Sequence, residues 1–290
     1  MNTDHPRGFT LVELLVVIGI IGLLVAILLP TLGAARNSSE QLRYIAGARE
    51  LVGGYNAYHY ENDGALMFGY PPSKVNGVPV TAEDPYTPTT ITFPLLAQRY
   101  PWRLAPYVGD VWEIIHLHRV TPNRPRPGMT PAETGASHYD LSINPAFGLN
   151  SGYLGGHIGF FFQGFIGDRP NYGAHVAFKA TEIRRPSEQI VFTETQGKNL
   201  GPLGIESVDG EAPGFFLTTP PRANGQFWDV DDNGEFVLTS GIATGLPLGR
   251  HGAAAVGFFD GHAAALEPAE LLDMRQWAPF ADAVDYDYTN

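Results

Sequence analysis

The chain has 290 residues and a formal net charge of −12 at pH 7, with 18 Lys and Arg against 30 Asp and Glu. A chain this acidic has no charge-based attraction to nucleic acid or to anionic lipid head groups, so no nucleic-acid partner is expected. It contains no cysteine, which excludes disulfides, thiolate metal sites and cysteine nucleophiles.

A long apolar segment follows a short polar leader at the N-terminus. The 21 residues from Phe9 to Leu29 would form a helix of about 31 Å, which matches a hydrocarbon core of about 30 Å. The one charged residue in this run is Glu13. Placing a carboxylate in a bilayer costs about 2.5–3.5 kcal/mol, so Glu13 indicates a function and predicts a cation held at the same depth.

An ordinary secretory signal peptide or signal anchor is the alternative interpretation of this segment. A signal peptide has a basic leader, an apolar core of about 7–15 residues and a small-residue cleavage site. Here Arg7 is balanced by Asp4, the apolar run is longer, and no such site closes it. A generic anchor has no need of Glu13, so this alternative is disfavoured.

The residues at the start of the apolar run form a processing motif, Gly8-Phe9-Thr10-Leu11-Val12-Glu13. They closely resemble the processing site of type IV prepilins and type II secretion pseudopilins. The resemblance implies that a membrane prepilin peptidase cleaves after Gly8 and methylates Phe9, and that Glu13 pairs with the freed amine of a neighbouring subunit. It further implies assembly with sister pilin-like subunits on a secretion or pilus assembly platform.

The resemblance and the charge distribution disagree about membrane orientation. The resemblance implies a single-pass inner-membrane protein with a cytoplasmic leader and a C-terminal domain that is periplasmic or, after assembly, on the cell surface. The positive-inside rule gives the opposite orientation, because Arg7 precedes the span whereas three arginines follow it, at Arg36, Arg43 and Arg49. We adopt the orientation that the resemblance implies, since glutamates are interleaved with those arginines and the domain is long.

The helical pattern continues beyond the span and becomes amphipathic. Apolar residues recur at spacings of three or four and line one face of a helix, namely Leu42, Ile45, Ala48, Val52 and Tyr55. The stop signal is Asn62-Asp63-Gly64. We therefore predict one helix from Phe9 to about Glu61, roughly 80 Å long, with a bend at Pro30 and weak points at Gly33 and Gly53-Gly54. Packing against a sheet is the favoured role of Tyr55, Tyr58 and Tyr60, and ligand stacking is the alternative.

The remainder of the chain alternates turn residues with short β-like runs. The clearest predicted strands are Ile158–Phe162, Ala174–Phe178, Gln189–Glu194, Phe227–Val230, Glu235–Thr239 and Ala254–Phe259. Residues 102–107 and 111–115 are either helical or extended. No βαβ alternation, phosphate-binding loop or serine elbow is present, so the predicted class is α+β with a C-terminal antiparallel sheet. The predicted divisions are a leader (1–8), a transmembrane and assembly helix (9–29), its amphipathic continuation (30–63) and a globular α+β domain (64–290).

Three further segments resemble a pattern of large pilin-like proteins with a processing-associated His-x9-Asp-Gly domain. They are Tyr58–Gly64, the Pro-Ser-Glu run within Ile183–Phe192, and Arg250-His251-Gly252 followed by Phe258–His262. Eight residues separate His251 from Asp260, one fewer than the pattern has. A metal or acid/base cluster of His251, Asp260 and His262 is one interpretation. The favoured one is structural, with Asp260-Gly261 as a tight hairpin turn and no catalytic residue.

Residues 229–234 match the opening of an EF-hand-like calcium loop, with Asp229, Asp231 and Asn233 as alternate oxygen ligands. The twelfth position is Ser240 instead of a bidentate glutamate, and the flanks are strand-like. The alternative is a hairpin turn rich in Asp and Asn, which favour turns for backbone reasons. Calcium is thus the one cofactor for which the sequence contains a candidate site.

The function predicted from these observations is a structural subunit, a pilin-like protein or pseudopilin assembled through its N-terminal helix into a filament. Two alternatives remain: a membrane-anchored module that binds a secreted substrate or glycan, and an anchored enzyme. Glu13 favours the first, because neither alternative requires a charge in the anchor. The sequence does not discriminate a secretion pseudopilus from a surface pilus or an uptake fibre.

Overall fold

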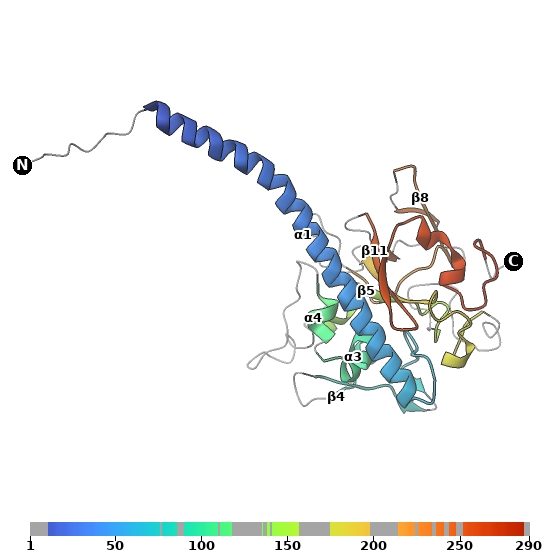
Figure 1. Cartoon of the computed structure of the whole chain (residues 1–290). Helices are drawn as coiled ribbons and strands as arrows, with labels where there is room; N and C mark the ends of the chain where they lie inside the picture. Colours follow the sequence, from blue (N-terminus) through green and yellow to red (C-terminus); the bar gives the residue numbers. More distant parts are fainter. Residues whose placement is uncertain are drawn as a thin grey trace, which may run out of the picture. The chain divides into compact units, whose positions relative to one another are not determined.

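The computed structural model describes residues 11–75, 77–85, 90–109, 111–117, 135, 138–139, 141–156, 175–197, 214–223, 226–233, 236–240, 244–247 and 252–286. The chain divides into two compact units, residues 1–42 and 43–290, each described here by itself. The helix α1 (Leu11–Glu61) contributes its first part to one unit and its second part to the other (Figure 1).

In the first unit α1 is continuous through Pro30 and Gly33. Pro30 has no amide hydrogen to donate to the preceding turn. Thr31 Oγ1 donates a hydrogen bond to the backbone carbonyl of Leu28, in the same turn, at 2.9 Å. The predicted helix therefore passes its proline without ending.

The helix ends where the sequence predicted. Glu61 is its last residue, and the amide of Gly64 donates to the carbonyl of His59 at 2.8 Å. Gly64 has a φ of +74°, in the left-handed region where glycine carries no steric penalty. The Asn62-Asp63-Gly64 signal thus acts as a C-terminal cap.

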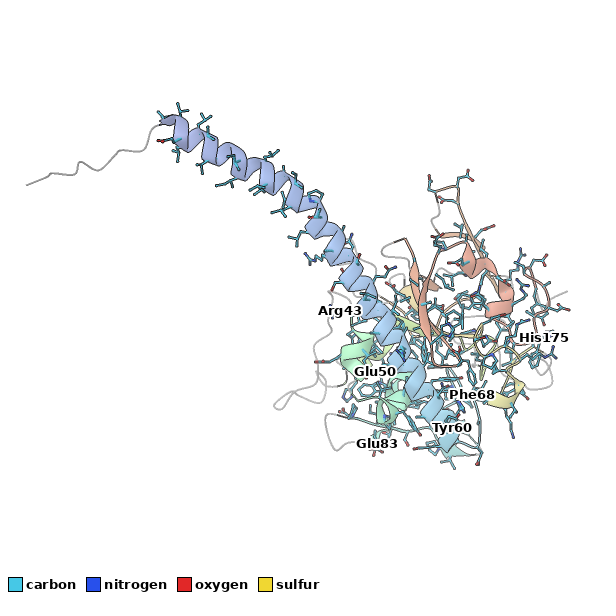
Figure 2. All side chains as sticks on the ribbon, viewed as in Figure 1. Arg43, Glu50, Tyr60, Phe68, Glu83 and His175 are labelled. Atoms are coloured by element: carbon cyan, nitrogen blue, oxygen red, sulfur yellow. The ribbon has the colours of Figure 1, made fainter. Side chains whose placement is uncertain are left out.

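In the second unit α1 buries one face of its last five turns. The buried residues are Tyr44, Gly47, Ala48, Leu51, Val52, Gly54, Tyr55 and His59. Two predictions for this face are wrong: Leu42, a member of the predicted apolar set, is exposed, and Tyr60, predicted to pack against a sheet, is 80% exposed. The buried stripe runs through Tyr44 and Leu51, which leaves Tyr60 on the exposed side of the helix with Arg43 and Glu50 (Figure 2).

The main sheet comprises β5 (Phe147–Leu149), β6 (Ile190–Gly197), β10 (Thr244–Pro247), β11 (Ala254–Phe258) and β12 (Ala263–Leu266). All of its pairings are antiparallel. β6 is central and pairs with β5, β10 and β11, while β12 pairs with β11. The predicted α+β class with a long N-terminal helix and a C-terminal antiparallel sheet is confirmed.

Both faces of this sheet are covered. Successive side chains of a strand point to opposite faces, and all five residues of β11 are buried. Ala255 packs in the cluster that contains the buried apolar face of α1. Val256 packs in a second cluster, formed with Leu271, Met274 and Trp277 of the C-terminal segment, residues 267–286. The second half of α1 lies beside β5 and β11 (Figure 1), as contacts of Gly47 with Phe147 and of Gly257 with Val52 require.

A second sheet contains β7 (Arg222–Ala223), β8 (Gln226–Val230) and β9 (Phe236–Ser240). Two hairpins pair β1 (Lys74–Val75) with β2 (Val78–Pro79) and β3 (Ala82–Glu83) with β4 (Thr90–Ile91). The short helices are α2 (Pro94–Ala97), α3 (Tyr100–Leu104), η1 (Ala105–Tyr107), α4 (Val111–Ile115), η2 (Ala180–Glu182), η3 (Glu270–Leu272) and η4 (Met274–Gln276).

Several sequence predictions for this unit have clear outcomes. The strands predicted around 190, 227, 236 and 254 are present as β6, β8, β9 and β11. Residues 102–107 and 111–115 are helical. The strand predicted at 174–178 is wrong, because its described residues form only an isolated bridge, between Ala177 and Leu154. The strand predicted at 158–162 lies outside the described residues.

Candidate membrane and assembly helix

The first part of α1 carries an apolar surface that the chain itself leaves uncovered. Its large apolar side chains from Leu11 to Leu32 are all exposed, by between 43% and 81%. Of the described part of the chain, this is the one helix long and apolar enough to cross a membrane. Leaving such a surface in water costs about 25 cal/mol per Å². Lipid or the apolar helices of other subunits would remove that cost.

Glu13 lies in the first turn of α1 that the structure describes, among exposed apolar side chains. No other ionisable residue occurs before Arg36 along the described helix. A carboxylate near a helix N-terminus is favoured by the helix dipole, which offsets part of its cost in an apolar medium. The predicted processing residues Gly8 and Phe9 lie outside the described residues, so their prediction still rests on sequence.

The structure places Asp260 and Gly261 in the turn between β11 and β12. The amide of Gly261 donates to the carbonyl of Phe258 at 2.9 Å, and its φ of +99° favours glycine. Asp260 Oδ1 accepts from the amide of His262 at 3.0 Å and lies 2.6 Å from its Nδ1. The imidazole also stacks on the ring of Phe258, with centroids 4.2 Å apart.

This pair at the turn is half exposed and mainly fixes the turn. Partial burial acts to raise the pKa of Asp260, but hydrogen bonds from His262 outweigh it and hold that pKa below its usual value. His251, the third member of the predicted cluster, lies outside the described residues. Of the three residues of the predicted cluster, Asp260 and His262 are thus hydrogen-bonded to each other.

The predicted calcium loop forms the connection between β8 and β9. Asp231 Oδ1 accepts from the amide of Asn233 at 2.9 Å, which is an Asx turn, and Asp229 Oδ1 accepts from the amide of Val230 at 2.8 Å. Within the described ranges, no group of three Asp, Glu or His side chains converges on one point. The described part of the loop thus has the hydrogen bonds of an Asx turn.

Sequence reasoning missed the role of the residues that start β6. Gln189 Nε2 donates to the carbonyls of Gln276 and Trp277 at 3.0 and 2.8 Å. Arg185 donates to the carbonyls of Arg275 and Ala281 at 3.1 and 2.8 Å. The Pro-Ser-Glu run between them thus belongs to a segment that holds the C-terminal segment against the sheet. The resemblance of the Pro-Ser-Glu run to large pilin-like proteins marked this segment in the sequence, but it did not indicate that the segment binds the C-terminal segment.

A comparison with known families matches one part of the chain. Residues 5–29 match the family model of the prokaryotic N-terminal methylation motif. That match contains Gly8, Phe9, Glu13 and the apolar run, and it ends before the globular domain begins. No curated protein and no solved structure matches the chain. The motif and the uncovered apolar helix together support a pilin-like N-terminus that is processed by prepilin peptidase and anchored in a membrane.

Proposed function

We propose that the protein is a pilin-like structural subunit, cleaved after Gly8 by prepilin peptidase, methylated on Phe9 and assembled through α1 into a filament of the type II secretion or type IV pilus kind. One combination supports the proposal: the methylation motif at residues 5–29 and an apolar helix that the domain does not cover. The partners are the peptidase, sister pilin-like subunits and an assembly platform in the inner membrane.

Glu13 has a defined role in this proposal. Its carboxylate costs about 2.5–3.5 kcal/mol in the bilayer as long as it has no partner there. Cleavage after Gly8 creates an amine on Phe9, and in a filament the amine of one subunit meets the carboxylate of the next. Each subunit thereby supplies a cation to the carboxylate of its neighbour, which sets the axial register between them.

A structural role is also favoured by the side chains that superficially resemble a catalytic triad. His138 Nε2 lies 3.1 Å from Asp84 Oδ2, and both side chains are buried. Ser142 Oγ, however, donates to the backbone carbonyl of His138 at 3.1 Å. Arg99 donates to the same hydroxyl at 2.9 Å. A hydroxyl that donates its proton to a backbone carbonyl is not oriented toward a base, so the proposal gives this group a structural role.

The proposal is tested by co-expressing the full chain with a prepilin peptidase and determining the N-terminus by mass spectrometry. We expect a mature chain that begins with methylated Phe9. Gly8→Val should block cleavage, whereas Gly8→Ala should be tolerated far better, because the peptidase must approach the backbone closely. An intact Met1 in the presence of active peptidase, or a cut beyond Leu29, would refute the proposal.

A further inference from the structure

A cavity of about 360 Å³ lies in the second unit, between the smaller sheet and the C-terminal segment. Its volume falls within the range of about 300–1,000 Å³ that is typical of small-ligand sites. The lining residues come from β7, β8, η3 and the last described turn, and they are Pro221, Arg222, Trp228, Asp229, Leu272, Val284 and Asp285. No motif in the sequence pointed to this cavity, because its walls come from three separated segments.

Hydrogen bonds to neighbouring elements hold the walls in place. Tyr153 donates from its hydroxyl to the carbonyl of Arg222 at 2.9 Å. Trp228 Nε1 donates to the carbonyl of Thr219 at 2.8 Å, and the amide of Met274 donates to the carbonyl of Val284 at 2.9 Å. A cavity with fixed walls spares a ligand the entropic cost of ordering them.

Three charged side chains that line the cavity have no ion-pair partner among the residues that the structure describes. Arg222, Asp229 and Asp285 are exposed, and none of them makes a salt bridge in the described structure. Asp229 uses one carboxylate oxygen for the amide of Val230 and keeps the other. The apolar part of the wall contains Val284, a valine that is 48% exposed. One cation, two carboxylates and an apolar wall thus surround a single space.

We propose that this cavity binds a ligand that carries a cation at the end of an aliphatic chain together with a carboxylate. The cation lies by Asp229 and Asp285, the aliphatic chain contacts Leu272 and Val284, and the carboxylate pairs with Arg222. A basic α-amino acid has this chemistry, and so does the basic C-terminal residue of a peptide. The inference does not depend on the proposed filament function, because the cavity is distant in sequence from the processing motif.

The test uses the full-length protein in detergent micelles, with chelator present to exclude metal effects. Nα-acetyl-L-lysine is the reference probe, and calorimetric titration measures its affinity. Nα-acetyl-L-lysinamide lacks the carboxylate and Nα-acetyl-L-norleucine lacks the cation. Each should bind about fivefold more weakly, the size of a partly exposed ion pair. Tighter binding of free L-lysine would identify the amino acid as the ligand, and tighter binding of the acetylated form the peptide end.

Variants assign each charge to its partner. Arg222→Gln should abolish the difference between acetyl-lysine and acetyl-lysinamide. Asp285→Asn should reduce the difference between acetyl-lysine and acetyl-norleucine, because Asp229 remains beside the cation. Asp282→Asn is the matched control, because it removes the same charge from the same segment outside the cavity lining. Equal affinities for the three acetylated probes, no measurable binding of any probe, or an equal effect of Asp282→Asn and Asp285→Asn would overturn the inference. Unchanged melting temperatures show that the variants are folded.

Discussion

Gly257 of β11 lies so close to Val52 of α1 that a Cβ atom on the glycine would be 2.5 Å from the valine Cγ2. The same atom would lie 2.9 Å from the carbonyl oxygen of Ala48. The helix backbone can approach the sheet this closely only where the strand has no side chain. This contact joins the N-terminal helix to a strand made near the end of the chain.

The first prediction concerns this close approach. Gly257→Ala should lower the free energy of unfolding by about 1–3 kcal/mol, because the added methyl group overpacks the interface. Gly53→Ala is the matched control: Gly53 is exposed, a Cβ there meets nothing within 4 Å, and helix propensity should give a gain of about 0.5–1 kcal/mol. Urea unfolding of the full chain in micelles measures both. A Gly257→Ala protein as stable as wild type would contradict the packing argument.

The second prediction concerns the hold on the C-terminal segment. Gln189→Ala removes two hydrogen bonds, to the carbonyls of Gln276 and Trp277, and should cost about 1–3 kcal/mol. The Trp277 carbonyl keeps the hydrogen bond that Asn150 Nδ2 donates to it at 2.9 Å, so the loss falls mainly on the part-buried carbonyl of Gln276. Hydrogen exchange should rise selectively in residues 270–281. Glu188→Gln should have little effect, since its pair with Arg185 is a surface one. Uniform exchange across the domain in Gln189→Ala would argue against a local hold.

The third prediction concerns pH. His59 is buried and stacks on Phe259, with ring centroids 5.3 Å apart, and burial lowers its pKa. The unfolded chain therefore binds more protons than the folded one as pH falls through about 6.5, and stability decreases in that range. The loss should level off below the folded pKa. His59→Phe keeps the stacked ring and should flatten stability between pH 7.5 and 5.5, as measured by urea unfolding; an unchanged slope would contradict the assignment. His262→Gln, at an exposed site, is the control.

The fourth prediction separates membrane insertion from assembly. Glu13→Ala removes a costly charge, so membrane insertion should be unchanged or better. Filament assembly should slow or fail, because the amine of the neighbouring subunit loses its partner. Crosslinking and sedimentation of membrane-extracted filaments measure assembly. Glu50→Ala, an exposed change further along α1, serves as the control. If the Glu13→Ala protein assembles at the wild-type rate and gives normal crosslinks, the hypothesis that Glu13 pairs with the neighbouring amine is wrong.

The fifth prediction concerns calcium at the loop between β8 and β9. Asp229, Asp231 and Asp232 are exposed and close in sequence, so a cation should relieve their repulsion. Because the twelfth loop position is Ser240 instead of a bidentate glutamate, the affinity should be weak, about 10⁻⁴–10⁻³ M. Stabilisation should reach about 2.7 kcal/mol at a hundredfold excess over Kd. A melting temperature indifferent to calcium, or a calcium shift that survives Asp231→Ala, would leave the loop as an ordinary turn.

The parts of the fold that sequence predicted are those with a strong local signal. The cap at Asn62-Asp63-Gly64 ends α1, and β6 and β11 are apolar runs bounded by turn residues. The strand β12 was implied only by the predicted hairpin turn at Asp260-Gly261, because its own residues Ala263, Ala264 and Ala265 have helical propensity. Its pairing with β11 across the Asp260-Gly261 turn overrides that propensity.

The candidate sites divide in the same way. Glu13 is recognisable from sequence, because a charge within an apolar run is informative by itself. The cavity could not be recognised from the sequence, because Arg222, Asp229 and Asp285 are brought together only by tertiary packing. The failure of Leu42 and Tyr60 to join the buried face has a similar cause. Spacing defines a helical stripe, but contacts with the sheet decide which neighbouring stripe is covered.

The hold of Gln189 and Arg185 on the C-terminal segment has a consequence for the order of events during synthesis. A ribosome makes α1 before the strand β11 that packs on it and before the carbonyls that these side chains bind, at Trp277 and Ala281. The apolar run can therefore enter the membrane while the domain is still an open chain. The domain can close only after residues 254–281 have left the ribosome, on a polypeptide whose apolar helix was made about two hundred residues earlier.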